Sequence, residues 1–197
     1  MPVSNLPSPR ERGTTILISG ERGAGKTTAL LRVRAAALGA GLSAGGFLSV
    51  ARFAGDEKVG IDVLDAATGA LHPLAEVGEG GALRTGVYRF HPAGIAAGLR
   101  FAQDGQGADV FFADELGPLE LERGEGWADV LPLIAARAFG VGFVVVRPSL
   151  LTVVRARLSL PDGTPIAIIE RGAGDAVAET LAAWVMVLRT GRNLLAR

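Results

Sequence analysis

The sequence predicts an α/β fold in which helices cover both faces of a mostly parallel sheet. Short segments that are almost continuously apolar, as is typical of strands buried on both faces, alternate with longer segments of helix-forming residues. Between residues 45 and 90 the pattern changes to an antiparallel hairpin and turns, which we interpret as an insertion. The length of 197 residues suits one well-packed domain. We therefore expect a flexible tail over residues 1–12 and a single domain over residues 13–197.

The expected strands and helices follow one another in a regular order. Strands are predicted at residues 14–19, 45–53, 58–65, 108–113, 141–146 and 165–170, with a shorter strand at 87–90. Helices are predicted at residues 28–38, 92–103, 127–138, 149–157 and from 175 to about 189. The turn cluster at residues 54–57 joins its two flanking strands as a hairpin, and residues 66–90 are otherwise rich in turns.

The composition narrows the class of protein. Apolar residues make up 49% of the chain, which is typical of a folded protein. Glycines and serines interrupt the longest uncharged stretch, residues 35–51, and the N-terminal residues lack the apolar segment of a signal peptide, so we expect no membrane insertion. No basic stripe with interleaved aromatic residues indicates a nucleic-acid partner. The absence of cysteine excludes disulfides and thiolate metal sites, and we expect a cytoplasmic protein.

Residues 20–27 match the phosphate-binding pattern G-x-x-x-x-G-K-[ST], the P-loop. The pattern lies between a predicted strand and a predicted helix, which is the order that a P-loop requires. Its glycines let the backbone N–H groups curl around phosphate oxygens, and Lys26 adds a positive charge for the β- and γ-phosphates. The Thr27 hydroxyl is a suitable ligand for Mg²⁺. The predicted nucleotide-binding residues are Gly20, Glu21, Arg22, Gly23, Ala24, Gly25, Lys26, Thr27 and Thr28.

A pair of carboxylates supplies the second half of the predicted site. Asp114 and Glu115 follow an apolar strand, where burial of carboxylates is costly unless a cation or hydrogen-bond donors satisfy them. We expect Asp114 to bind Mg²⁺ together with Thr27, and Glu115 to orient a water molecule toward the γ-phosphate. Ligands of such sheets bind at the carboxyl ends of parallel strands, so the P-loop, the acidic pair and Arg147 should converge. The predicted catalytic residues are Glu115, Lys26 and Arg147.

For several charged residues the sequence allows both a role in the site and a role outside it. Arg147 either contacts the γ-phosphate as an internal arginine finger or balances the charge of residues 51–125, which carry thirteen acidic and six basic side chains. Glu120 either supports the site from behind or is solvated. Arg52 and Lys58 either reach the phosphates from the hairpin or face water. A contact of Arg171 with the nucleotide is left open.

Residues 114–121 resemble the D-E-x-G-x-x-E-L signature of a small family of P-loop nucleoside-triphosphatases, known from thermophiles and, in animals, as the cancer-related nucleoside-triphosphatase. Gly46, Phe47 and Arg52 resemble the family's G-G-F-x-x-x-x-[RK] stretch, and residues 58–61 resemble its R-x-G-F hairpin. The resemblance implies a RecA-like sheet and slow, Mg²⁺-dependent hydrolysis of ATP, GTP and other nucleoside triphosphates. The chain departs from the family where Glu170-Arg171-Gly172 lacks the asparagine of an E-N-R-like stretch.

The predicted function is therefore hydrolysis of a nucleoside triphosphate (NTP) to the diphosphate (NDP) and phosphate, with Mg²⁺ as cofactor and broad tolerance for the base. Two alternatives remain. A small-molecule kinase would use the same P-loop, although the acidic pair favours water as the nucleophile. A nucleotide-dependent accessory protein of a transport or cofactor-insertion system would act through a protein partner that the sequence does not identify.

Overall fold

The structure is a computed structural model that describes residues 13–81 and 83–195, with side chains described as far as residue 187. The predicted tail, residues 1–12, lies outside the described residues. The described part of the chain forms one nine-stranded sheet with the order β5-β6-β4-β3-β2-β7-β8-β1-β9. The strands are β1 (Thr14–Ser19), β2 (Ala44–Ala54), β3 (Glu57–Asp65), β4 (Leu71–Val77), β5 (Arg84–Thr85), β6 (Tyr88–Phe90), β7 (Val110–Leu116), β8 (Val141–Val146) and β9 (Ile166–Ile168).

Two types of pairing divide the sheet. The five strands β9, β1, β8, β7 and β2 pair in parallel, and β3, β4, β6 and β5 continue the sheet through antiparallel pairs. Strand β8 lies between β1, which leads into the P-loop, and β7, which carries the acidic pair. The carboxyl ends of β1, β8 and β7 therefore form one continuous edge, and the three predicted parts of the site follow this edge.

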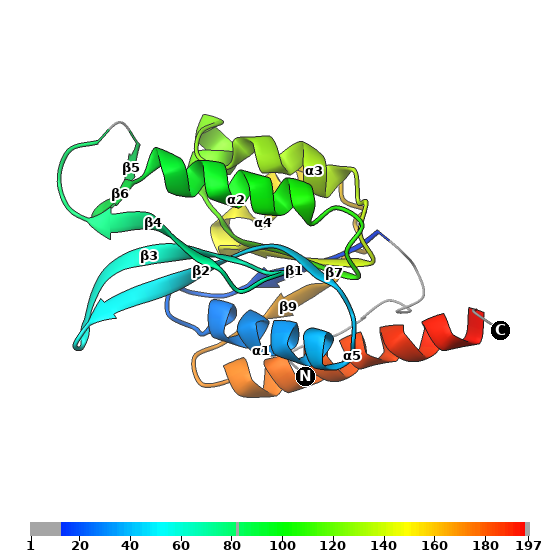
Figure 1. The fold of residues 1–197 in the computed structure, drawn as a ribbon. Helices are drawn as coiled ribbons and strands as arrows, with labels where there is room; N and C mark the ends of the chain where they lie inside the picture. The colour runs from blue at the N-terminus through cyan, green and yellow to red at the C-terminus, as the bar shows by residue number, and fades with distance from the viewer. Residues whose placement is uncertain (1–12, 82, 196–197) are drawn as a thin grey trace.

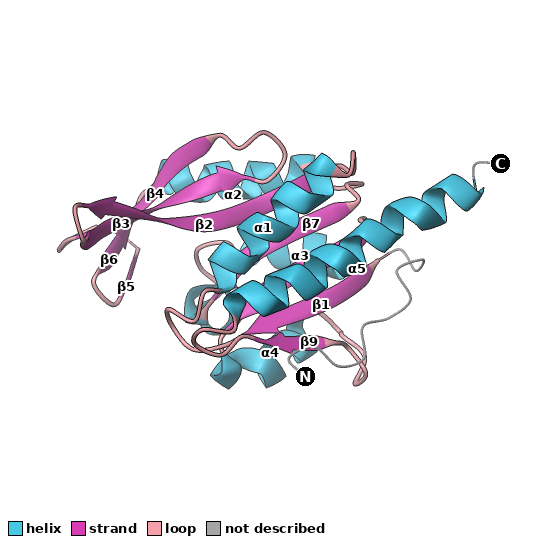
Figure 2. Cartoon of the chain, turned by 90° about the horizontal axis from the view of Figure 1, so that it is seen from below, coloured by secondary structure: helices cyan, strands magenta, loops and turns pink. Residues whose placement is uncertain are grey.

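Helices cover both faces of the sheet. Helices α1 (Lys26–Gly39) and α5 (Gly174–Leu195) lie on one face, where Figure 2 shows them side by side, and α2 (Pro92–Asp104), α3 (Leu131–Ala135) and α4 (Leu151–Arg157) lie on the other (Figure 1). Alternate residues of one strand enter different cores. Ile16 and Ile18 pack with α1 and α5, whereas Leu17 packs on the opposite face. This alternation is what strands buried on both faces require, and the predicted α/β fold with an antiparallel insertion is confirmed.

Three segments of the structure differ from the sequence-based predictions. Residues 71–77, which were predicted only as part of a stretch rich in turns, form β4, and Pro73 lies beside an irregularity in the pairing with β3, where a residue without a backbone N–H is tolerated. The predicted helix at 127–138 is reduced to a 3₁₀ turn (Ala128–Val130) and the short α3, and Pro132 occupies the first turn of α3. A π-helical turn (Leu119–Arg123), which the sequence did not indicate, follows β7.

None of the described helices is both long enough and apolar enough to cross a membrane.

The core on the α1 and α5 face provides a test of the fold. Phe112 is fully buried, and its ring lies 5.7 Å from that of Phe143, whereas Phe53 near the tip of the β2–β3 hairpin is 59% exposed. We expect Phe112→Ala to lower the free energy of unfolding by about 3–5 kcal/mol, because it leaves a cavity. Phe53→Ala should change it by less than about 1 kcal/mol. Urea unfolding of both variants measures the difference, and equal losses would contradict this assignment of the core.

Candidate active site

The P-loop connects β1 to α1 and has the backbone that an anion site needs. Gly25 precedes α1 with a left-handed φ of 94°, and Gly23 has a φ of 76°. In the described structure no side chain caps the first turn of α1, so its N–H groups remain available at the loop. These groups and the positive end of the helix dipole favour a phosphate at this position.

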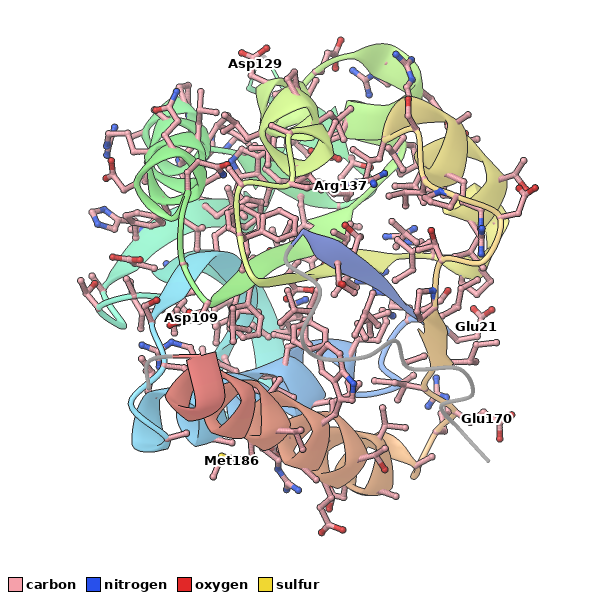
Figure 3. All side chains as sticks on the ribbon, turned by 90° about the vertical axis from the view of Figure 1, so that its right-hand side faces the viewer. Glu21, Asp109, Asp129, Arg137, Glu170 and Met186 are labelled. Carbon is pink, nitrogen blue, oxygen red and sulfur yellow. The ribbon has the colours of Figure 1, made fainter. Side chains whose placement is uncertain are left out.

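The first glycine of the loop is required for another reason. A side chain at Gly20 would overlap the carbonyl group of Ile169, which follows β9. The amide of Ile169 donates a hydrogen bond of 2.7 Å to the Ser19 carbonyl oxygen, so the segment between β9 and α5 packs directly on the P-loop. Figure 3 shows Glu21 and Glu170 at the same edge of the molecule, and both are exposed. The chain after β9 thus forms one wall beside the loop.

Lys26 lies across the P-loop. Its Nζ donates hydrogen bonds to the carbonyl oxygens of Gly20 at 2.7 Å and Glu21 at 2.8 Å. Burial lowers the pKa of Lys26, and the nearby carboxylates of Glu115 and Asp114 oppose this shift. The ammonium group therefore lies over the loop, and its contact with phosphate stays a prediction.

Asp114 is the buried member of the acidic pair, with 1% of its surface exposed. Its Oδ2 accepts hydrogen bonds from the Thr27 hydroxyl at 2.8 Å and from the Ser49 amide at 3.0 Å. Its Oδ1 is buried and has no hydrogen-bond partner among the described residues. Burial, and next the repulsion by Glu115, raise the pKa of Asp114 to about 7.

These contacts fit a hard cation. A buried carboxylate oxygen without a donor is costly, and a divalent ion would satisfy it. The Thr27 hydroxyl lies beside the same carboxylate and offers a second oxygen ligand. The described residues contain no cluster of three or more His, Cys, Asp or Glu side chains suited to a metal. Thr27 and Asp114 are thus the residues that could hold Mg²⁺ together with phosphate oxygens and water.

Glu115 is exposed, whereas Asp114, the residue directly before it, is buried. The pairing of β7 with β8 shifts register between Ala113 and Leu116, so β7 carries one extra residue as a β-bulge. Glu115 has a positive φ of 63°, which is strained for a residue with a side chain. The bulge leaves the Glu115 carboxylate exposed, and the Arg147 guanidinium lies 3.4 Å from it.

The structure brings most of the predicted site residues together. Thr27 contacts Asp114, Arg147 contacts Glu115, and both carboxylates lie close enough to Lys26 to affect its pKa. Around them in the P-loop, Ala24 is buried, Gly20 packs on the segment after β9, and the other predicted residues are at the exposed rim of the loop, namely Glu21, Arg22, Gly23 and Thr28, with Gly25 partly exposed. The acidic pair was predicted to follow its strand, but it lies in a bulge within β7, which extends to Leu116.

Glu120 is not the solvated residue that one interpretation expected. Its carboxylate is buried and accepts hydrogen bonds from the Gly117 amide at 2.9 Å and the Trp127 amide at 3.2 Å. Burial raises the pKa of Glu120. The signature that begins at Asp114 therefore includes a residue that fixes the turn after β7, which agrees with the interpretation that Glu120 supports the site from behind.

The two hairpin cations have different surroundings. Arg52 forms an ion pair of 3.1 Å with Asp62. The Nζ of Lys58 lies 5.1 Å from the centre of the Tyr88 ring. Arg22 of the P-loop also reaches this tyrosine, and its Nη2 donates a hydrogen bond of 3.3 Å to the hydroxyl oxygen.

Sequence reasoning missed two residues that contact the site, Ser49 and Tyr88. Ser49 is a polar residue in an apolar strand, which is a weak signal because its partner, Asp114, is 65 residues away. Tyr88 stands in a short segment that the sequence predicted only as a strand, and no local pattern connects it to a loop 66 residues earlier.

The raised pKa of Asp114 predicts how stability depends on pH when neither metal nor nucleotide is present. The folded protein holds this proton more tightly than the unfolded chain, so Asp114 lowers the free energy of unfolding as pH rises from about 4 to about 7. Asp114→Asn removes this cost, because the amide oxygen can accept both hydrogen bonds that Oδ2 receives. We expect the variant to be more stable than the parent by on the order of 3 kcal/mol at pH 8, and similar to it near pH 4.

Urea unfolding at several pH values measures this difference. Asp56→Asn, in the exposed turn between β2 and β3, is the matched control and should show no such dependence. A difference between Asp114→Asn and the parent that stays constant from pH 4 to pH 8 would contradict the raised pKa.

Three curated relatives, each named Nucleoside-triphosphatase THEP1, are similar to this chain. The relative from Thermofilum pendens is 34% identical over 53% of this chain and 59% of its own length. The relative from Archaeoglobus fulgidus is also 34% identical, over 54% of this chain and 62% of its own length. The chain thus spans about three fifths of the length of these two relatives. The relative from Caldivirga maquilingensis is 25% identical over 84% of this chain and 92% of its own length.

Two solved structures share the fold. A human cancer-related nucleoside triphosphatase matches with a TM-score of 0.65 and 19% identity, over 87% of this chain and 97% of its own. THEP1 from the hyperthermophile Aquifex aeolicus matches with a TM-score of 0.60 and 20% identity, over 87% of this chain and 99% of its own. A family model described as NTPase matches residues 15–154, where the P-loop, the acidic pair and Arg147 all lie. This match spans well over half of the chain, which therefore belongs to the NTPase family.

Proposed function

We propose that this chain hydrolyses nucleoside triphosphates to the diphosphate and phosphate in an Mg²⁺-dependent reaction. The observation that carries the proposal is the different burial of two adjacent carboxylates beside a P-loop. Asp114 is buried against Thr27, whereas Glu115 is exposed in a strained bulge. The membership of the chain in the NTPase family and its similarity to proteins named nucleoside-triphosphatase support the same reaction.

The P-loop would bind the phosphates of the substrate. Its backbone N–H groups and the start of α1 favour anionic oxygens, and Lys26 would exchange its two carbonyl contacts for contacts with the β- and γ-phosphates. Thr27 and Asp114 would hold Mg²⁺, which when bound neutralises charge on the β- and γ-phosphate oxygens. The position of Asp114 is fixed in advance by the hydrogen bonds from Thr27 and Ser49.

Glu115 would direct the attacking water. Its carboxylate would accept a proton from a water molecule that attacks in line with the γ-phosphorus, and the bond from the γ-phosphorus to the bridging oxygen would break as the new P–O bond forms. The leaving oxygen remains on the diphosphate. A carboxylate at this position favours water as nucleophile, and we therefore propose hydrolysis rather than transfer to an alcohol. Broad tolerance for the base, a cytoplasmic location and a single domain over residues 13–197 stay predictions.

Glu115→Gln tests this assignment. The amide keeps the size of the side chain but does not accept a proton, so we expect hydrolysis to fall by about 10²–10⁴-fold. Binding of a non-hydrolysable NTP with Mg²⁺ should stay within about threefold of the parent, since the P-loop is unchanged. Phosphate release and equilibrium binding measure the two effects. Glu179→Gln, on the exposed face of α5, is the matched control. Hydrolysis by Glu115→Gln at the parent rate would refute the role of this carboxylate.

Arg147 would act on both the catalytic carboxylate and the substrate. Its guanidinium pairs with Glu115 at 3.4 Å, which holds that carboxylate at the end of β8, and both side chains are about half exposed. On substrate binding it would turn toward the γ-phosphate and stabilise the charge that develops there.

We expect Arg147→Met to lower kcat by about 10–100-fold while the affinity for the NDP stays unchanged. Arg100→Met, which removes a positive charge from the exposed surface of α2, serves as the control. Steady-state kinetics and NDP binding distinguish this role from charge balance, for which kcat would match that of the control.

A further inference from the structure

Tyr88 connects the P-loop to the inserted strands. The Arg22 guanidinium donates a hydrogen bond of 3.3 Å to the Tyr88 hydroxyl oxygen, and its central carbon lies 5.9 Å from the centre of the ring. On β3, the Lys58 ammonium lies 5.1 Å from the same centre. One aromatic ring therefore holds two positive charges, one from the P-loop and one from the hairpin, through cation–π attraction.

This contact is unexpected from the order of the strands. Six strand spacings separate β6, which carries Tyr88, from β1, which leads into the P-loop. In a flat sheet they would be about 29 Å apart, too far for two side chains to meet. The inserted strands must therefore turn back over the carboxyl ends of the parallel strands. Figure 1 shows β3, β4 and β6 at the end of the molecule where α1 begins. The insertion thus forms a second wall of the phosphate site, opposite the segment after β9.

The cations near this edge differ in their partners. Arg52 is paired with Asp62, Arg147 with Glu115, and Arg89 with Glu76. Within the described part of the chain, neither Arg22 nor Lys58 forms an ion pair with a carboxylate, and no other polar partner of Lys58 is found there. Two uncompensated positive charges beside a phosphate loop are a site for a further anionic group.

Tyr88 is suited to hold these charges in place. Only 8% of its surface is exposed, and its ring packs in the core on the α2 face. A buried ring with two rotatable bonds loses little freedom when a ligand binds, whereas exposed arginine and lysine side chains lose more. The contacts with Tyr88 restrict both cations before the ligand arrives, which lowers the entropic cost of binding.

We propose that Tyr88 is a positioning residue that holds Arg22 and Lys58 as a pair of cations for the terminal phosphate of an NTP. The inference rests on the proposed function only in taking an NTP as the ligand. An NTP carries one phosphate more than an NDP, and the two uncompensated charges match this added anion. The pair makes the site bind NTP more tightly than NDP, and it ceases to act on the nucleotide once the γ-phosphate has been cleaved. Product release is then favoured without any change in the P-loop.

The dissociation constant for NDP divided by that for a non-hydrolysable NTP, both measured with Mg²⁺, tests this role. A larger ratio means stronger preference for the NTP. Arg22→Met and Lys58→Met should each lower the ratio by about tenfold, since each removes one charged contact. Lys58→Arg should keep it near that of the parent. Tyr88→Phe keeps the buried ring but loses the hydroxyl, and should lower the ratio about threefold. Added to Arg22→Met, Tyr88→Phe should have no further effect, because its hydroxyl acts through Arg22.

A merely structural role for Tyr88 would change thermal stability but not the NDP-to-NTP ratio. Tyr88→Leu keeps an apolar core residue and removes the ring, and should lower the ratio more than Tyr88→Phe. Arg100→Met, the control for net charge, should keep the parent ratio. The inference is overturned if the parent binds NTP no more tightly than NDP, or if both Tyr88 variants keep the parent ratio. It is also overturned if the double variant Arg22→Met with Tyr88→Phe lowers the ratio by the full product of the two single effects.

The binding ratio requires no turnover, so the two proposals fail separately. If Glu115→Gln hydrolysed at the parent rate while the binding ratios changed as expected, the catalytic assignment would be wrong and the role of Tyr88 would stand. If Glu115→Gln lost hydrolysis while all ratios stayed at the parent value, the role of Tyr88 would be wrong and the catalytic assignment would stand.

Discussion

The hydrogen bond from the Thr27 hydroxyl to the Asp114 carboxylate is the interaction on which the rest of the site depends. It joins the start of α1 to β7 across 87 residues of sequence, and β8 lies between the two parallel strands that lead to these residues. The Ser49 amide ties β2 to the same carboxylate oxygen. Three elements thus meet at one buried charge, whose burial opposes folding unless a cation is near. Stability and function conflict at this position, as is common where a charged site is prepared in advance for its ligand.

The β-bulge in β7 resolves a second constraint. Two acidic residues in a row would normally face opposite sides of a strand, and the residues just before them, Phe112 and Ala113, pack in the cores on the two faces of the sheet. The extra residue of the bulge and the positive φ of Glu115 release its side chain to the edge of the sheet. Glu120 fixes the turn that follows through two backbone amides. A buried carboxylate outside the strand therefore holds the chain directly after the strained residue.

The sequence predicted the parts of the molecule that short-range patterns control. The P-loop, the apolar strand at residues 141–146 and the acidic pair all depend on neighbouring residues. It could not predict β4, because Pro73 is unfavourable in a strand unless the partner strand is irregular at that point, and this depends on β3. It also left open whether Glu120 is solvated, because the donors that satisfy its carboxylate come from a turn with no regular period. The contact between Arg22 and Tyr88 depends on the curvature of the whole sheet, which no local pattern records.

The P-loop is held from two sides, and this determines what the site can recognise. On one side, Gly20 packs against the carbonyl of Ile169, and on the other, Arg22 contacts Tyr88 on the inserted strands. A loop restrained at both positions is formed before the phosphates arrive, so little ordering is needed on binding. Arg22 and Lys58, which we propose to bind phosphate, contact the buried ring of Tyr88, whereas Glu170 and Arg171 in the segment after β9 are exposed. This division favours selection of the ligand by its phosphates rather than by its base, as the proposed broad tolerance for the base requires.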